Sequence, residues 1–168
     1  MRVPASPLRG ELTSVRPATD TDADLLVRWH RDPEIARYWD SETFTHDEIR
    51  ARLASQHVDP YIVEADGEPI GYLQAWFDGD PPRDAGLDMF LVPAARGRGF
   101  GPDAARALTA YLLQEARRDL LTVDPYLSNT RAIRAWRKAG FRPIEERPPD
   151  GDHTETWLLM TTSPVASE

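Results

Sequence analysis

The spacing of apolar residues changes along the chain, and each change predicts a new element. Up to about residue 55, apolar side chains recur three or four positions apart, as they do on one face of a helix. From residue 61 to residue 92 they come in short runs separated by turn residues such as Asp66-Gly67, which is typical of strands in hairpins. The later part alternates between the two patterns. The chain is therefore predicted to place antiparallel hairpins before a strand–helix–strand unit.

Capping residues mark the helix starts. Thr21 and Thr45 each precede an acidic residue by three positions, the spacing of a capping box, and Pro33 suits a first helical position. Pro102 suits a first helical position too, and Gly140 suits the position after a helix end. The predicted helices begin near residues 20, 33 and 45 and cover residues 102–115 and 129–139. The predicted strands cover residues 12–16, 61–63, 70–77, 87–92, 120–123, 141–145 and 156–160.

This order of elements predicts an α/β protein with one mixed sheet rather than a doubly wound parallel sheet. A length of 168 residues fits one domain, and we find neither a repeat nor a linker. We therefore expect a single domain over residues 1–168, with flexible ends at about 1–10 and 162–168.

The composition excludes several classes of protein. Without cysteine, the chain cannot form a disulfide, a cysteine–zinc site or a cysteine nucleophile. The histidines at positions 30, 46, 57 and 153 lack metal-ligand spacing, so we expect no metal, and each is predicted to lie on the surface rather than to act in catalysis. A net charge of -8 argues against nucleic-acid binding and favours a cationic partner. Without a visible signal peptide or membrane span, we expect a cytoplasmic protein.

A glycine-rich segment, Arg96-Gly97-Arg98-Gly99-Phe100-Gly101, lies between a predicted strand and a predicted helix. Glycines allow the backbone to approach a ligand closely, and free N–H groups at a helix N-terminus bind anions. A plain turn is the alternative. The segment lacks the Lys-Ser/Thr of a Walker loop, and no acidic residue stands where a dinucleotide fingerprint needs one. The pattern therefore indicates an anion site of another kind.

The Arg-x-x-Gly-x-Gly pattern of residues 96–101 resembles the acyl-CoA loop of the Gcn5-related N-acetyltransferases, known as GNAT enzymes. The likeness continues at Asn129, Trp136 and Gly140-Phe141, in the order that this family has beside pantetheine. It implies a mostly antiparallel twisted sheet, splayed between its fourth and fifth strands and flanked by about four helices. It also implies acetyl-CoA as acyl donor, bound by the residues Phe90, Leu91, Val92, Arg96, Gly97, Arg98, Gly99, Phe100, Gly101, Asn129 and Trp136.

A narrower resemblance is to the aminoglycoside 6′-N-acetyltransferases, carried by residues 67–74, Gly86-Leu87-Asp88, Val123-Asp124-Pro125 and Tyr38-Trp39-Asp40. It implies a small cationic amine as substrate, an aminoglycoside that is acetylated on its 6′-amino group in a ternary complex, with antibiotic resistance as the consequence. Asp88 is the implied proton acceptor. The substrate-binding residues that we expect are Trp39, Asp40, Gln74, Asp88, Asp124 and Tyr126. A strand-start aspartate that bonds a nearby N–H is the alternative for Asp88, and an Asp-Pro turn is the alternative for Asp124. Nothing in the sequence decides between a monomer and a homodimer.

One position departs from the family pattern. Many members have tyrosine seven residues after the motif asparagine, where it can protonate the leaving thiolate, but this chain has Trp136. An indole N–H donates a hydrogen bond but is no acid near neutral pH, which leaves Tyr126 as a possible substitute. Three rival functions stay open. They are the same chemistry on another amine (a protein N-terminus, a polyamine or a metabolite), a noncatalytic acyl-CoA-binding module, and a pyridine-nucleotide enzyme.

The charge of the chain is unevenly distributed. Residues 88–142 hold 10 bases and 5 acids, whereas the other 113 residues hold 10 bases and 23 acids. A basic segment suits the phosphates of CoA, and an acidic remainder attracts a polycationic amine. Surface solvation is the alternative explanation for part of that acidity.

Overall fold

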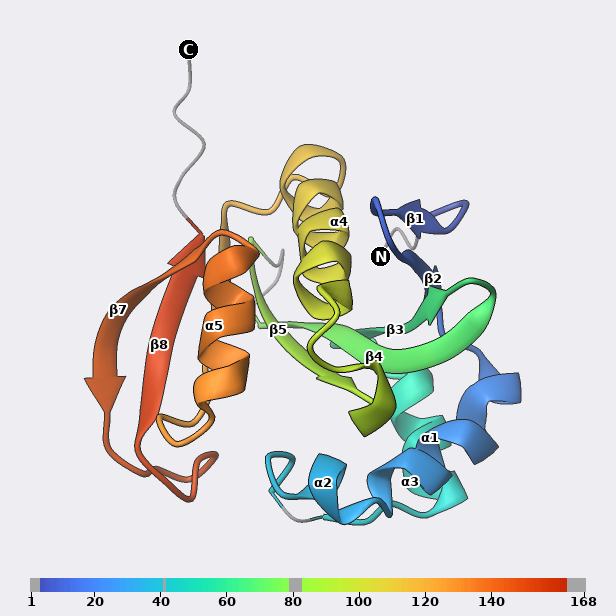
Figure 1. Cartoon of the computed structure of the whole chain (residues 1–168), viewed down its shortest axis with the longest axis horizontal. Coiled ribbons are helices and arrows are strands. Elements are labelled where there is room, and N and C mark those ends of the chain that lie inside the picture. The colour runs from blue at the N-terminus through green and yellow to red at the C-terminus, as the bar shows by residue number, and fades with distance from the viewer. Residues whose placement is uncertain (1–3, 41, 79–82, 163–168) are drawn as a thin grey trace.

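A computed structural model describes residues 4–40, 42–78 and 83–162 (Figure 1). Its centre is one eight-stranded sheet with the strand order β1-β2-β3-β4-β5-β6-β8-β7. The strands are β1 Leu8–Arg9, β2 Ser14–Pro17, β3 Val58–Ala65, β4 Glu68–Phe77, β5 Asp84–Leu91, β6 Leu120–Val123, β7 Phe141–Arg147 and β8 Trp157–Thr162. Within the described ranges, every neighbouring pair is antiparallel except β5 and β6, which run parallel. The predicted mixed sheet is thus confirmed.

The sheet opens between its parallel strands. β5 pairs with β6 only at its start, where Asp84–Gly86 face Leu120–Thr122, and its later residues have no β6 partner. On its other side β5 remains paired with β4 from Ala85 to Leu91. The predicted splay is therefore present, and it leaves one edge of β5 open beyond Gly86.

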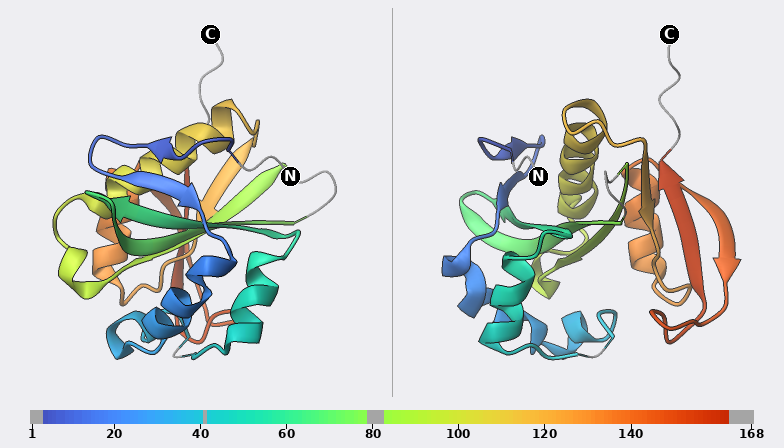
Figure 2. Two further views of the ribbon diagram at one scale, coloured as in Figure 1. Left: turned by 90° about the vertical axis from the view of Figure 1, so that its right-hand side faces the viewer. Right: turned by 180° about the vertical axis from the view of Figure 1, so that it is seen from behind.

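In the described part of the chain five α-helices cover the sheet, one for each helix predicted from the sequence and one more than the resemblance implied. They are α1 Ala23–His30, α2 Pro33–Ala36, α3 His46–Leu53, α4 Phe100–Gln114 and α5 Thr130–Lys138. Figures 1 and 2 show α1, α2 and α3 on one side of the sheet, and α4 on the other, with α5 beside the β7–β8 hairpin. In the described part of the chain, no helix is both long and apolar enough to cross a bilayer.

Alternation along the central strands fills two separate apolar layers. Val63 and Leu73 join the cluster under α4, whereas Ile62, Tyr72 and Phe90 join the cluster under α1 and α3. Successive strand residues point to opposite faces, so one strand serves both layers. Asp88 and Phe90, two positions apart on β5, therefore face the side of α1 to α3.

The acidic side chain of Asp103 ties the N-terminal segment to α4. Its carboxylate accepts hydrogen bonds from the backbone N–H groups of Glu11, Leu12 and Thr13 at 2.9 to 3.1 Å, and from Thr13 Oγ1 at 2.6 Å. These bonds hold the pKa of Asp103 below its usual range against the effect of burial. The first turn of α4 is thereby fixed next to the glycine-rich segment.

Several local predictions were displaced by one or two positions or missed. The first capping box uses Thr19 and Asp22 instead of Thr21 and Asp24, and opens a short 3-10 turn, Asp20–Asp22, before α1. α4 begins at Phe100, so Pro102 is its third residue and not its first. The two-residue strand β1 was not predicted, because it is defined only by its pairing with β2. The predicted loop of residues 78–84 and tail after residue 161 fall largely on 79–82 and 163–168, outside the described residues.

Candidate active site

A cavity of about 1220 Å³ opens where β5 and β6 diverge. Its walls come from β5, the segment after β6, α5, the start of α4, residues 34–40 and the loop between β7 and β8. Its volume exceeds the roughly 300–1,000 Å³ typical of a single small-molecule site. Of the predicted site residues, all line this cavity except Val92 and Arg98. The cavity thus gathers predicted site residues that are up to 97 positions apart in the sequence, from Trp39 to Trp136.

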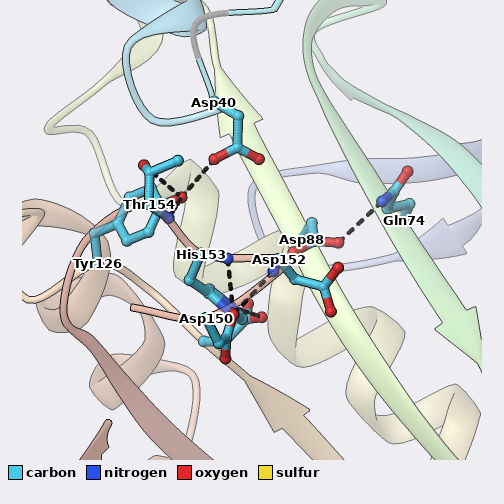
Figure 3. A network of polar contacts seen from close by, with 9 residues as sticks. Asp40, Gln74, Asp88, Tyr126, Asp150, Asp152, His153 and Thr154 are labelled. Atoms are coloured by element: carbon cyan, nitrogen blue, oxygen red, sulfur yellow. Dashed lines mark hydrogen bonds and ion pairs between the residues drawn. The ribbon is translucent and has the colours of Figure 1, made fainter. Parts of the chain in front are cut away.

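Asp88 lies on the floor of the cavity in a polar chain across two strands (Figure 3). Gln74 donates from Nε2 to Asp88 Oδ2 at 2.9 Å, and accepts at Oε1 from the Tyr72 hydroxyl at 2.7 Å. Burial raises the pKa of Asp88 to about 7, and the charge of Asp124 adds to this rise; the hydrogen bond from Gln74 and the charges of Arg52 and His153 oppose it. Asp88 is consequently a carboxyl group that can exchange a proton near neutral pH.

Asp124 follows β6 and forms an ion pair that sequence reasoning missed. His153 Nε2 lies 2.7 Å from Asp124 Oδ2, and His153 Nδ1 lies 2.8 Å from Asp150 Oδ1. The prediction that His153 lies free on the surface was wrong, since 13% of its side chain is exposed. The sequence predicted only the strands 141–145 and 156–160 on either side of His153, and no local pattern shows on which surface the segment between them packs.

His30 also contradicts the prediction that each histidine lies on the surface. It is fully buried among Trp39, Phe44 and Phe90, and burial, together with the charge of Arg52, lowers its pKa to about 3. His30 Nε2 lies 3.1 Å from Arg52 Nη1, so the neutral ring accepts a hydrogen bond there. His30 therefore supports the layer beneath the cavity rather than facing solvent.

Two indole side chains, Trp39 and Trp76, line the cavity and are packed differently. Trp39 lies edge-on to Tyr72 and Phe90 at centroid distances of 6.0 and 5.5 Å, which places it partly in the apolar layer under the cavity. Trp76 lies over Gly86, where an added Cβ would come within 2.0 Å of its ring. Both indoles line the cavity and offer flat apolar surfaces to a ligand.

Tyr126 joins the segment after β6 to the loop after α2. Its hydroxyl donates to Asp40 Oδ1 and lies 3.3 Å from the backbone nitrogen of Thr154 (Figure 3). Burial and the hydrogen bond to Asp40 raise the pKa of Tyr126, so the phenol keeps its proton at neutral pH. Its O–H bond points to Asp40 in this arrangement.

The glycine-rich segment forms the opposite part of the cavity. Gly97 and Gly99 have φ of 76° and 83°, a conformation that favours glycine, and a Cβ added at Gly97 would meet no described atom within 4 Å. Gly99 directly precedes α4, whose first N–H groups are free to bind an anion. This backbone can therefore lie close against a ligand without obstruction by side chains.

The two arginines of the segment are placed differently. Arg96 lines the cavity, with Nε 3.2 Å from Leu91 O and Nη2 3.1 Å from Glu34 O. Burial, and next the charge of Arg131, lower the pKa of Arg96. Arg98 instead lies exposed over the Phe100 ring at 4.8 Å, outside the cavity lining. Three further cations line the cavity from α5 and were not predicted as site residues: Arg131, Arg134 and Lys138.

The open edge of β5 presents backbone groups to the cavity. Val92 donates its N–H to Ile70 O, so by alternation Phe90 also bonds toward β4, opposite Tyr72. Leu91 lies between them, so its N–H points into the space between β5 and β6. Its carbonyl points the same way, since it accepts a hydrogen bond from Arg96 Nε. Of the three backbone positions predicted here, only Leu91 therefore offers a free N–H to the cavity.

Two other predicted contacts also serve the fold. Trp136 is 5% exposed and packs edge-on against Phe141 at 5.3 Å, so its indole belongs mainly to the core. Asn129 caps α5 by accepting the N–H of Ala132 at 3.2 Å. Among the described residues, no group of three metal-ligating side chains comes together.

Comparison with known proteins gives consistent matches. The family described as acetyltransferase (GNAT) domain matches residues 18–148. An aminoglycoside N(6′)-acetyltransferase type 1 from Klebsiella pneumoniae is 32% identical, over 82% of this chain and 78% of the relative. A solved structure of AAC(6′)-Ib with paromomycin and acetyl-CoA superposes with a TM-score of 0.80 at 28% identity, covering 91% of this chain and 94% of that chain. Its complex with coenzyme A and kanamycin gives a TM-score of 0.77, also at 28% identity, over 90% and 94% of the two chains.

Proposed function

The chain belongs to the GNAT acetyltransferase family, and we propose that it transfers the acetyl group of acetyl-CoA to the 6′-amino group of an aminoglycoside. The observation that carries this proposal is one cavity in which cations prevail on one wall and carboxylates on another. Cations line it beside the start of α4 and along α5: Arg96, Arg131, Arg134 and Lys138. Carboxylates line it from the strand ends and facing loops: Asp40, Asp88, Asp124, Asp150 and Asp152. Glu34, Arg37 and Arg147 line the cavity as well, so the division is one of excess charge. An anionic donor and a polycationic acceptor would each meet a complementary surface.

The residues of the glycine-rich segment fit the phosphates of CoA. Arg96 approaches Arg131 closely enough that the repulsion lowers its pKa, and a bound anion would relieve this repulsion. The open space at Gly97 and the free N–H groups of α4 would accept phosphate oxygens. Pro102, the third residue of α4, removes one of these donors. When bound, acetyl-CoA supplies an activated thioester carbonyl to this site.

The open edge of β5 would receive the pantetheine arm as an added strand. The free N–H of Leu91 would then donate to the thioester oxygen as negative charge develops on it. Donors of this kind are worth roughly 10²–10³-fold in rate. Holding donor and acceptor in one cavity would supply a further part of the acceleration.

Asp88 would bind the reacting ammonium and take its proton, directly or through water. Its pKa of about 7 suits a base that works near neutral pH. A carboxylate with this role contributes roughly 10²–10⁴-fold. The Tyr72–Gln74 chain would keep Asp88 Oδ2 engaged, which leaves Oδ1 for the amine.

Tyr126 and Trp136 are the two side chains to consider as a proton donor for the leaving CoA thiolate. The indole of Trp136 is no acid near neutral pH, and the Tyr126 hydroxyl is already engaged with Asp40. We expect the CoA thiolate to leave unprotonated or to take a proton from water. A Tyr126→Phe variant should then keep most of its turnover.

Thiol release from acetyl-CoA tests the function directly. The purified chain is mixed with acetyl-CoA and kanamycin, and in parallel with spermidine, lysine and a peptide N-terminus. Turnover with kanamycin well above the other amines supports the proposal, and mass spectrometry then locates the acetyl group. Turnover with another amine alone would reassign the acceptor, and acetyl-CoA binding without any turnover would indicate a noncatalytic module.

A further inference from the structure

His153 lies between two carboxylates of the cavity. Nε2 is 2.7 Å from Asp124 Oδ2. Nδ1 is 2.8 Å from Asp150 Oδ1, as Figure 3 shows. A neutral imidazole carries a single N–H, so it can donate to only one of these acceptors. Both distances are those of charge-assisted hydrogen bonds. The geometry therefore assigns His153 as an imidazolium.

The ring is also held in place from its faces. It stacks on the Trp157 indole at a centroid distance of 4.1 Å with 13° between the planes, and Tyr126 meets it edge-on at 6.2 Å. The position thus does not depend on one flexible contact, although the histidine belongs to the loop between β7 and β8. An aromatic face beneath an imidazolium further favours its charged form.

The surroundings of the ring are mainly acidic. Titratable and charged groups face it from several elements: Asp88 on β5, Asp124 and Tyr126 after β6, Asp150 in its own loop, and Arg147 on β7 above Trp157. Burial alone would lower the pKa of His153, but the hydrogen bonds and charges of Asp150 and Asp124 outweigh it, so the pKa is raised. The ring therefore keeps its proton to a higher pH than a free imidazole does.

On the basis of the proposed function, we propose that the His153 imidazolium is a built-in competitor for Asp124, which a second ammonium group of the acceptor must displace. His153 would thereby set the affinity of the cavity for polycations. In the free protein it satisfies an acidic wall that would otherwise hold unpaired charges. A bound polycation replaces it at Asp124 Oδ2, and the released imidazole gives up a proton to solvent.

Calorimetry on the wild-type chain and on His153→Gln tests this competition. Kanamycin is titrated into each at about pH 6.5, in two buffers of different ionisation enthalpy, so that proton release is measured with affinity. Glutamine keeps one amide donor but carries no charge. We expect the variant to bind kanamycin roughly threefold to tenfold more tightly and to release fewer protons. The difference should shrink as the pH is raised, because the wild-type ring loses its charge once its raised pKa is passed.

A matched control is His57→Gln, the same change at an exposed histidine outside the cavity lining. It should leave both affinity and proton release unchanged. NMR of the imidazole resonances of the wild-type chain reports the protonation state of His153 without any substitution. Kanamycin should move the His153 resonances to those of a neutral ring.

The outcomes separate this inference from the function on which it rests. Equal or weaker kanamycin binding by His153→Gln at about pH 6.5, or a His153 ring that stays charged in the complex, would overturn the competition and make His153 a support for Asp124. A wild-type chain that neither binds nor acetylates kanamycin would overturn the proposed function and this inference with it. If the chain releases thiol with kanamycin, but His153→Gln binds kanamycin no more tightly and the His153 ring stays charged, only the inference is overturned.

Discussion

Gln74 donates a hydrogen bond from Nε2 to Asp88 Oδ2 over 2.9 Å, across the antiparallel pair of β4 and β5. The same amide accepts from Tyr72 at Oε1, so its orientation is fixed and its N–H must face the carboxylate. This bond lowers the pKa of Asp88, while burial and Asp124 raise it. The proton affinity of the proposed base is therefore a balance in which burial and Asp124 oppose Gln74, Arg52 and His153.

Replacing the base should stop the chemistry without loss of the donor. Asp88→Asn keeps the size of the side chain but cannot take a proton from the amine. We expect turnover to fall by roughly 10²–10⁴-fold in the thiol-release assay, with a nearly unchanged Kd for CoA in calorimetry. Asp84→Asn, an exposed aspartate on the same strand, is the control and should behave like the wild type. Full activity of Asp88→Asn would remove Asp88 from the mechanism.

The acid side of the pH profile should follow the neighbours of Asp88. The base must be ionised, so kcat/KM should rise with pH through an inflection near 7. Asp124→Asn removes a negative charge that raises the pKa, so the inflection should move to lower pH. Gln74→Leu removes a donor that lowers the pKa, so the inflection should move to higher pH. Steady-state kinetics over a pH series gives both positions, and two unshifted profiles would show that another group controls the rate.

The glycine-rich segment should tolerate no side chain at Gly97 when CoA binds. Gly97 and Gly67 have nearly the same φ, 76° and 77°, and neither has a described atom near an added Cβ. Alanine at either position should therefore cost a similar stability, about 1 kcal/mol in thermal unfolding. Only Gly97→Ala should also weaken CoA binding in calorimetry, because Gly97 lines the cavity and Gly67 does not. Equal CoA affinities would place the phosphates elsewhere.

A buried carboxyl far from the cavity should make stability depend on pH. Asp59 on β3 is 5% exposed, and burial raises its pKa to about 6 although Arg118 opposes this. Because the folded-state pKa exceeds the ordinary value, the unfolded chain ionises first, and folding loses free energy as pH rises through about 6. Asp59→Asn removes this loss, so urea unfolding should find the variant more stable by roughly 1–2 kcal/mol at about pH 8.

The same comparison at acid pH completes the test of Asp59. Below about pH 4 both side chains are neutral, and the two stabilities should converge. Asp84→Asn, which changes an exposed carboxyl, should leave stability unaltered at both pH values. A less stable Asp59→Asn at about pH 8 would instead mean that attraction to Arg118 outweighs the cost of burying the charge.

The sequence by itself determined the elements and most of the chemistry that they carry. Apolar period, turn residues and caps are local properties, so they predicted the order of strands and helices, and the glycine-rich segment before α4. They could not separate Arg96 from Arg98, because two glycines with positive φ turn one arginine into the cavity and leave the other exposed. They also could not distinguish Leu91 from Phe90 and Val92. Only the pairing with β4 shows that Phe90 and Val92 direct their N–H groups toward β4, whereas Leu91 directs its N–H into the cavity.

Only the tertiary structure decided which charged groups meet. His153 lies 29 positions after Asp124 and was expected on the surface, yet the return of β8 beside β6 brings its loop over that carboxylate. His30 was also expected on the surface. In the structure it lies buried beside Trp39. Ionisable side chains carry no periodic signal of their own, because their energies depend on burial and on neighbours brought near by strand pairing. The proton affinities that set the proposed chemistry are thus properties of the folded sheet, whereas the residue types that make this chemistry possible can be read along the chain.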